Sequence, residues 1–95
     1  MAEITHRTTV QRATRVAARI IDGTAVVVII DRQELHTLNA VGTRVWELAD
    51  GRTVAEIADA IVAEYEVEPP LALSDVVRFT EKLSDLGALE LGSQQ

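Results

Sequence analysis

The strongest pattern in the chain is a pair of apolar, β-branched runs separated by an Asp-Gly dipeptide. Residues 16–21 (VAARII) precede Asp22-Gly23, and residues 24–30 (TAVVVII) follow it. Asp-Gly readily takes the positive φ angles of a type I′ turn, so this pattern predicts an antiparallel hairpin. A second turn over residues 31–33 leads to a third strand over 34–38, which we expect at the edge of a three-stranded sheet.

The second half of the chain has the periodicity of helices. Asn39 is a good N-cap, and Thr53 and Glu56 form a capping box. The Pro69-Pro70 pair separates the last two helical segments, because proline lacks the backbone donor that a helix interior needs. We expect helices over residues 40–49, 54–65 and 71–86, followed by a short strand or extended tail over 88–91.

Strands that precede helices, rather than alternating with them, indicate an α+β fold. Ninety-five residues suffice for one domain. Residues 1–14 have no clear periodicity, and we expect a flexible N-terminal segment there, followed by a folded domain over residues 15–91. Gly42 is unusual inside a helix, and close packing against another backbone would explain it.

The second predicted strand is apolar without interruption from Ala25 to Ile30. A sheet with one solvated face should alternate between apolar and polar residues, so this run suggests that both faces are covered. Helices can cover one face. The other face then needs a partner, a second copy or the N-terminal segment, unless the strand simply exposes two valines.

No set of residues suited to catalysis or to metal binding is found. The chain has no cysteine, and His6 and His36, its two histidines, lie in no metal-ligand spacing. Neither a Ser/His/Asp set nor a glycine-rich phosphate loop is present. We therefore expect no enzymatic activity, no metal and no cofactor.

Charge is distributed unevenly along the chain. Residues 1–20 hold four arginines and one glutamate, whereas the remaining residues hold five basic and fourteen acidic side chains. A nucleic-acid-binding domain usually has a basic face, so nucleic acid is not an expected partner. No apolar run reaches the ~18 residues of a membrane span, and the lack of cysteine fits a cytoplasmic location.

An ordered set of residues from Leu38 to Leu89 resembles the PqqD family. It starts with residues 38–48 (LNAVGTRVWEL), similar to the family's L-N-x-x-G-x-x-[IV]-W-x-L segment. The later members of the set are Asp50-Gly51, Ile57, Tyr65, Asp75-Val76, Phe79, Leu83 and Gly87. The chain departs from the family at Thr80 and Ala88, where the family often has leucine. This departure concerns the residue with which a binding partner would be anchored and not the fold.

The resemblance implies a winged-helix-like fold, with a three-stranded antiparallel sheet followed by three helices. It implies a chaperone that binds the leader of a ribosomally made precursor peptide and presents it to a modifying enzyme, often a radical SAM protein. In the namesake pathway the product is pyrroloquinoline quinone.

In this family the peptide adds as a strand to the third strand of the sheet, beside the third helix. An exposed sheet edge does bind extended peptides through its main-chain groups. The expected peptide-binding residues are Glu34, Leu35, His36, Thr37, Leu38, Val77, Arg78, Thr80, Glu81 and Ser84.

Two alternatives stay open. In the first, the chain is a structural or dimerisation subunit of a modification complex. The uninterrupted apolar strand would allow such a subunit to form a homodimer. Less favoured is a winged-helix nucleic-acid binder, since the third helix has only Arg78 and Lys82 as basic residues. The sequence names neither the precursor peptide nor the modifying enzyme.

Overall fold

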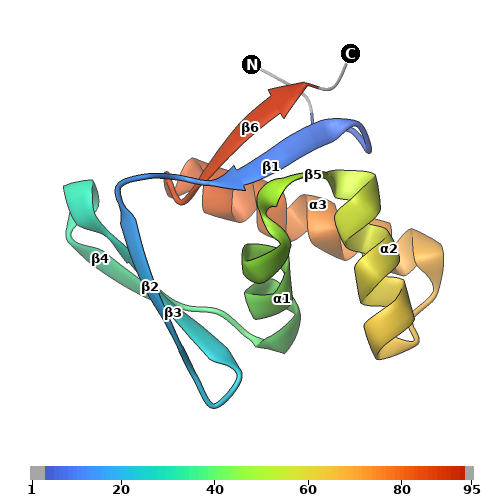
Figure 1. Ribbon diagram of the computed structural model, residues 1–95, viewed down its shortest axis with the longest axis horizontal. Coiled ribbons are helices and arrows are strands. Elements are labelled where there is room, and N and C mark those ends of the chain that lie inside the picture. The colour runs from blue at the N-terminus through green and yellow to red at the C-terminus, as the bar shows by residue number, and fades with distance from the viewer. Residues whose placement is uncertain (1–3, 94–95) are drawn as a thin grey trace.

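A computed structural model describes residues 4–93 and has two three-stranded antiparallel sheets and three helices (Figure 1). In chain order the elements are β1 (Thr8–Arg12), β2 (Val16–Ile21), β3 (Thr24–Ile29), the 3₁₀ turn η1 (Ile30–Arg32), β4 (Glu34–Thr37), α1 (Ala40–Leu48), β5 (Asp50–Thr53), α2 (Val54–Tyr65), α3 (Pro69–Asp85) and β6 (Leu89–Ser93). The α+β class and the three helices are confirmed.

The predicted hairpin forms the first half of a sheet with the strand order β2-β3-β4. Asp22 and Gly23 have φ angles of 52° and 78°, as a type I′ turn requires. The register pairs Val16 with Ile29 on one side of β3 and Ile29 with Glu34 on the other. As predicted, β4 lies at an edge of this sheet.

A second sheet, with the order β5-β1-β6, was not predicted. The expectation that residues 1–14 lack regular structure is wrong for Thr8–Arg12, which forms the central strand β1. Thr8 and Val10 of this strand are buried. Both partner strands are distant in sequence, so a local pattern in residues 8–12 gives little indication of a strand.

Side-chain caps fix where two of the helices begin. The Asn39 side chain accepts a hydrogen bond from the Gly42 amide at 2.8 Å, and Thr53 and Glu56 form the predicted capping box of α2. Helix α3 begins at Pro69, earlier than the expected start near residues 71–74. Proline is tolerated in the first turn because the amide that it lacks would have no partner inside the helix.

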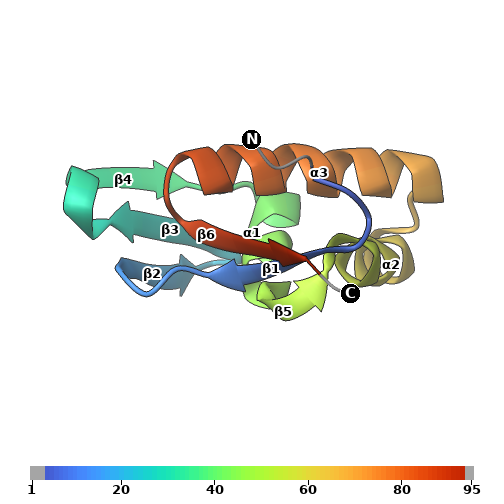
Figure 2. The same cartoon turned by 90° about the horizontal axis from the view of Figure 1, so that it is seen from above.

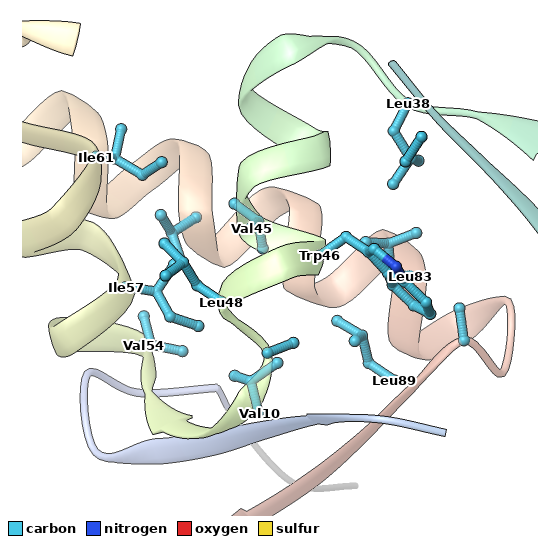
Figure 3. Packing of buried hydrophobic residues seen from close by; sticks show 14 of the residues in the cluster. Val10, Leu38, Val45, Trp46, Leu48, Val54, Ile57, Ile61, Leu83 and Leu89 are labelled. Carbon is cyan, nitrogen blue, oxygen red and sulfur yellow. The ribbon is translucent and has the colours of Figure 1, made fainter. Parts of the chain in front are cut away.

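The core lies where the three helices meet the two sheets (Figure 3). Val10, Val45, Ile57 and Leu83 are among its fully buried side chains. Thr43, also buried, accepts from the Ala25 amide at 2.8 Å and donates to the Leu38 carbonyl at 3.3 Å, which ties α1 to β3 and to the end of β4.

Gly42 does sit at a close approach between elements, although its neighbour is a side chain and not a backbone. A Cβ atom at this position would lie 2.7 Å from Cε1 of Phe79 on α3. The ring of Phe79 therefore packs directly on the first turn of α1, beside Asn39. This contact fixes which side of α3 faces the end of β4.

Candidate functional site

The free edge of β4 carries unpaired main-chain groups at two residues. The Leu38 amide donates to the Ala25 carbonyl at 2.9 Å, so Leu38 directs its main-chain groups toward β3. Main-chain groups alternate in direction along a strand, so those of Glu34 and His36 also point to β3. The N–H and C=O groups of Leu35 and Thr37 point to the free edge.

The C-terminal half of helix α3 contacts the segments that follow and precede β4. Beyond the end of β4, the Phe79 ring lies against Gly42 in the first turn of α1. Before its start, Arg32 of η1 donates to the Asp85 carbonyl at 3.0 Å. In Figure 2, β4 and α3 lie at about the same height, whereas β2 lies well below them. An extended chain paired with β4 would therefore be flanked by α3.

Phe79 defines the flank of α3 that faces the free edge of β4. We call the surface between this edge and this flank the strip. Residues spaced three or four apart share one face of a helix, which adds Asp75, Lys82 and Leu86 to the Phe79 flank. Phe79 and Leu86 are half-buried apolar side chains, and Lys82 is exposed. The contact residues expected from the sequence on α3 do not include Asp75, Phe79 or Leu86, so sequence reasoning missed this flank as a contact surface.

The residues expected on α3 divide between its two flanks. Val77, Glu81 and Ser84 are rotated by roughly 140–160° from Phe79 at 100° per residue, so they lie on the opposite flank. Arg78 lies next to the Phe79 flank, and its guanidinium donates to Asp75 at 2.8 Å. These three residues therefore do not share the flank of Phe79, and their contact with a peptide stays a prediction.

Two of the expected contact residues have buried side chains. Thr80 is fully buried and Leu38 is 3% exposed, so neither side chain reaches an added strand in this structure. The Thr80 hydroxyl is also the one buried side-chain polar atom among the described residues that has no hydrogen-bond partner. Its position on α3 turns it toward the core, together with Val76 and Leu83.

The polar side chains around the strip form two pairs, whereas Lys82 has no ion-pair partner among residues 4–93. Glu34 and His36, both on the inner side of β4, approach to 3.1 Å, and Asp75 pairs with Arg78. Among residues 4–93 there is no group of three His, Cys, Asp or Glu side chains that could hold a metal ion. The strip therefore offers main-chain hydrogen bonds, apolar contacts and a polar rim, which together suit the binding of an extended peptide.

Comparison with known proteins identifies the family. Residues 24–89 match the family model described as "Coenzyme PQQ synthesis protein D (PqqD)". The chain belongs to the PqqD family. Among solved structures, it is similar to TbiB1 in complex with the TbiA(beta) leader peptide, at 32% identity and a TM-score of 0.79. That match covers 90% of this chain and 99% of TbiB1.

Two further structures share the PqqD fold. Lasso peptide synthetase B1, complexed with the leader peptide, is 23% identical, with a TM-score of 0.74 over 85% of this chain and 96% of that one. The PqqD truncation of Methylobacterium extorquens PqqCD is 20% identical. It is described as a functional and stand-alone recognition element for ribosomally synthesized and post-translationally modified peptides (RiPPs). Its TM-score is 0.77 over 93% of this chain and 95% of that one. No curated protein matches the chain.

No helix among the described residues of this PqqD-family chain is both long and apolar enough to cross a membrane.

The basic N-terminal residues have structural contacts. Arg12 donates to the carbonyls of Trp46 and Glu47, at 3.0 and 2.9 Å, and so satisfies acceptors at the C-terminal end of α1. Arg15 pairs with Asp31 at 2.7 Å.

Proposed function

We propose that this chain binds the leader region of a ribosomally made precursor peptide by adding it as a strand to β4. The observation that carries the proposal is the free edge at Leu35 and Thr37, flanked by α3. The family, and the leader peptide bound to TbiB1, support the same ligand class. Main-chain pairing gives affinity for any extended segment, so specificity has to come from side chains.

Alternate side chains of the added strand would meet two different surfaces. Those opposite Glu34 and His36 point to the inner side, toward Phe79 and Leu86, and we expect apolar anchors there. Those opposite Leu35 and Thr37 point to the outer side. The proposed site is thus the edge Glu34–Thr37 together with the Phe79 flank and Arg78. Thr80 and the Leu38 side chain are left out because they are buried.

We further propose that the domain is a chaperone without catalytic activity, which presents the peptide to a modifying enzyme. A radical SAM partner, pyrroloquinoline quinone as the product, and a cytoplasmic location stay predictions of the sequence. The domain limits of residues 15–91 also stay a prediction, although β1 lies before residue 15 and pairs with β5 and β6.

The test is an NMR titration of ¹⁵N-labelled protein with the leader segment of the precursor encoded beside its gene. We expect amide shifts at Glu34–Thr37 and along α3 from Asp75 to Leu86. The decisive variant is Thr37→Pro, which removes an outward N–H without removing a bond to β3. One lost main-chain bond is worth about 0.5–1.5 kcal/mol, so affinity should fall by up to about tenfold, and further if the ring blocks pairing.

Ala18→Pro on β2 is the matched control. The Ile30 amide donates to the Arg15 carbonyl at 3.3 Å, so Arg15 and Ala17 direct their main-chain groups to β3 and Ala18 directs its groups outward. This variant also removes one outward N–H from an edge strand of the same sheet, and leader affinity should not change. Equal losses in both variants, or shifts confined to β2, would contradict strand addition at β4.

A further inference from the structure

The outer face of the β2-β3-β4 sheet is apolar and uncovered. Ala25, Val27 and Ile29 point inward and are buried, so the side chains between them point away from the helices. The register places the outward residues of the three strands together. We call the apolar members of this set, together with the exposed Ile30 that follows β3, the outer apolar face; its members are Ala17, Ile21, Val26, Val28, Ile30 and Leu35. Arg19, Thr24 and Thr37 are the polar residues on the same side of the sheet.

Three of these side chains are unusually exposed for their size. Ile21, Ile30 and Leu35 are 52%, 46% and 64% exposed, and they make up half of the large hydrophobic residues that are exposed in the described part of the chain. In Figure 1 the sheet projects from the helices with no element on its outer side. Of the described N-terminal residues, strand β1 belongs to the other sheet and does not cover this face. Exposed apolar side chains gathered on one face, with polar residues among and around them, mark an interaction surface.

Charge argues for a different protein rather than a second copy. Arg19 lies in the middle row of the face, opposite Val26, and forms no ion pair within residues 4–93. At the rim, Arg15 is already paired with Asp31. A two-fold contact centred on the face would bury the Arg19 guanidinium of each copy among apolar side chains, and the outward residues of the three strands include no carboxylate to pair with it. A partner that presents a carboxylate among apolar side chains would instead complement the face.

The face is also continuous with the proposed leader site. Leu35 is part of the outer apolar face, and its main-chain groups point to the edge where the leader would add. A leader residue paired with Leu35 would have its side chain on the outer side, which extends the row Ala17–Val28–Leu35 by one strand. The surface is therefore larger, and partly made of leader, only when the leader is bound.

We propose that the outer apolar face, together with the bound leader strand, is the docking surface for the peptide-modifying enzyme. The inference rests on the proposed function and names the surface through which that function is completed. Because the enzyme contacts both chains, leader and enzyme bind cooperatively, and each raises the affinity for the other by the same factor. Couplings of this kind are typically about 5- to 150-fold.

The experiment measures three affinities by calorimetry with the modifying enzyme encoded in the same gene cluster. They are domain for leader, domain for enzyme, and the leader-saturated domain for enzyme. The variants are Ile21→Thr, Arg19→Glu and, as a matched control, Ile20→Thr. Ile20 neighbours Ile21 on β2 and is similarly exposed, at 44%, but it points to the inner side. Thermal unfolding of each variant identifies any loss of fold.

We expect Ile21→Thr and Arg19→Glu to weaken enzyme binding about tenfold or more, with leader affinity unchanged and Ile20→Thr equal to wild type. Equal effects of Ile20→Thr and Ile21→Thr, or no effect of either, overturn the inference. Sedimentation that detects a dimer dissociated by Ile21→Thr also overturns it, because a second copy then covers the face. If wild type fails to bind leader, the proposed function fails instead, and the composite surface with it.

Discussion

Two buried threonines in the core differ in the hydrogen bonds of their hydroxyl groups. The hydroxyl of Thr43 both accepts and donates a hydrogen bond, between the Ala25 amide and the Leu38 carbonyl. The hydroxyl of Thr80 has no partner, although the residue is fully buried. A buried hydroxyl that forms hydrogen bonds contributes to stability. A buried hydroxyl without a partner lowers stability, because no hydrogen bond offsets the free energy of its desolvation.

Replacement of each threonine by valine should therefore change stability in opposite directions. We expect Thr80→Val to raise the free energy of unfolding by about 1 kcal/mol, since it removes an unpaired polar group at constant shape. Thr43→Val should lower it by about 1–3 kcal/mol, because the Ala25 amide is left buried and unpaired. Urea unfolding with a common m-value measures both. A stability loss in Thr80→Val would mean that its hydroxyl has a partner in solution.

The same residues show where sequence reasoning about the site reaches its limit. The edge at Glu34–Thr37 was predictable, because the hairpin and the third strand are local patterns. The inward direction of Thr80 was predictable from helical spacing, because Thr80 lies four residues after Val76 and three before Leu83, which are both buried. The error came from its hydroxyl group, which favoured a position at the surface.

At the level of elements, the contact between α1 and α3 depends on the absence of a side chain at Gly42. Alanine there would gain about 1 kcal/mol of helix propensity, but its Cβ would meet the Phe79 ring at 2.7 Å. The ring is held between two helices, and overpacking of this kind costs about 1–3 kcal/mol. The contact also aligns the flank of α3 with β4.

Gly42→Ala should consequently lower the free energy of unfolding by up to about 2 kcal/mol, despite the better helix former. It should also weaken leader binding, because the displaced ring belongs to the proposed site. The double variant Gly42→Ala/Phe79→Leu provides the control, since a smaller side chain relieves the overlap. If stability is not recovered in the double variant, the contact with Phe79 is not the cause.

The capping box of α2 predicts a dependence on pH. Hydrogen bonds from the Thr53 amide and hydroxyl hold the pKa of Glu56 below the ordinary value of a glutamate. A carboxylate with a lowered pKa in the folded state contributes stability that is fully present above the unfolded pKa. That contribution is lost as the pH falls through the folded pKa.

Glu56→Gln keeps a hydrogen-bond acceptor but cannot titrate. Between pH 5 and about pH 3, its melting temperature should therefore fall less steeply than that of wild type. Asp59→Asn is the control, because Asp59 is exposed on the same helix and has no hydrogen-bond or ion-pair partner among residues 4–93. Parallel curves for wild type and Glu56→Gln would show that the cap does not contribute to acid sensitivity.

For the whole molecule, the main departure from the sequence-based expectation is the sheet built around β1. The hairpin, the capped helices and the edge strand were predictable because each depends on residues close in sequence. Strand β1 depends on β5 and β6, whose pairing partners Thr53 and Leu89 lie more than 40 and 70 residues away. Arginine and threonine in residues 1–14 also resemble a solvated tail, although Val10 is fully buried.

A chain that starts at residue 13 should therefore lose cooperative folding, whereas a chain that starts at residue 4 should keep it. Without β1, the edges of β5 and β6 are left unpaired and the core loses Val10. Thermal unfolding by circular dichroism and the dispersion of amide NMR signals distinguish the two. Native-like unfolding of the shorter chain would restore the interpretation of residues 1–14 as a dispensable segment.

The pairing of β1 with β6 has a consequence for how the chain acquires its structure. Thr8 lies opposite Ser93 and Arg12 opposite Leu89, so these contacts span nearly the whole sequence. Closing so long a loop is unfavourable until other contacts have formed, and high contact order slows folding. During synthesis the hairpin and α1 leave the ribosome well before β6 exists. The edge of β4 is therefore exposed on a nascent chain that cannot yet close, and we expect the joining of β6 to β1 to be the late step that makes the fold cooperative.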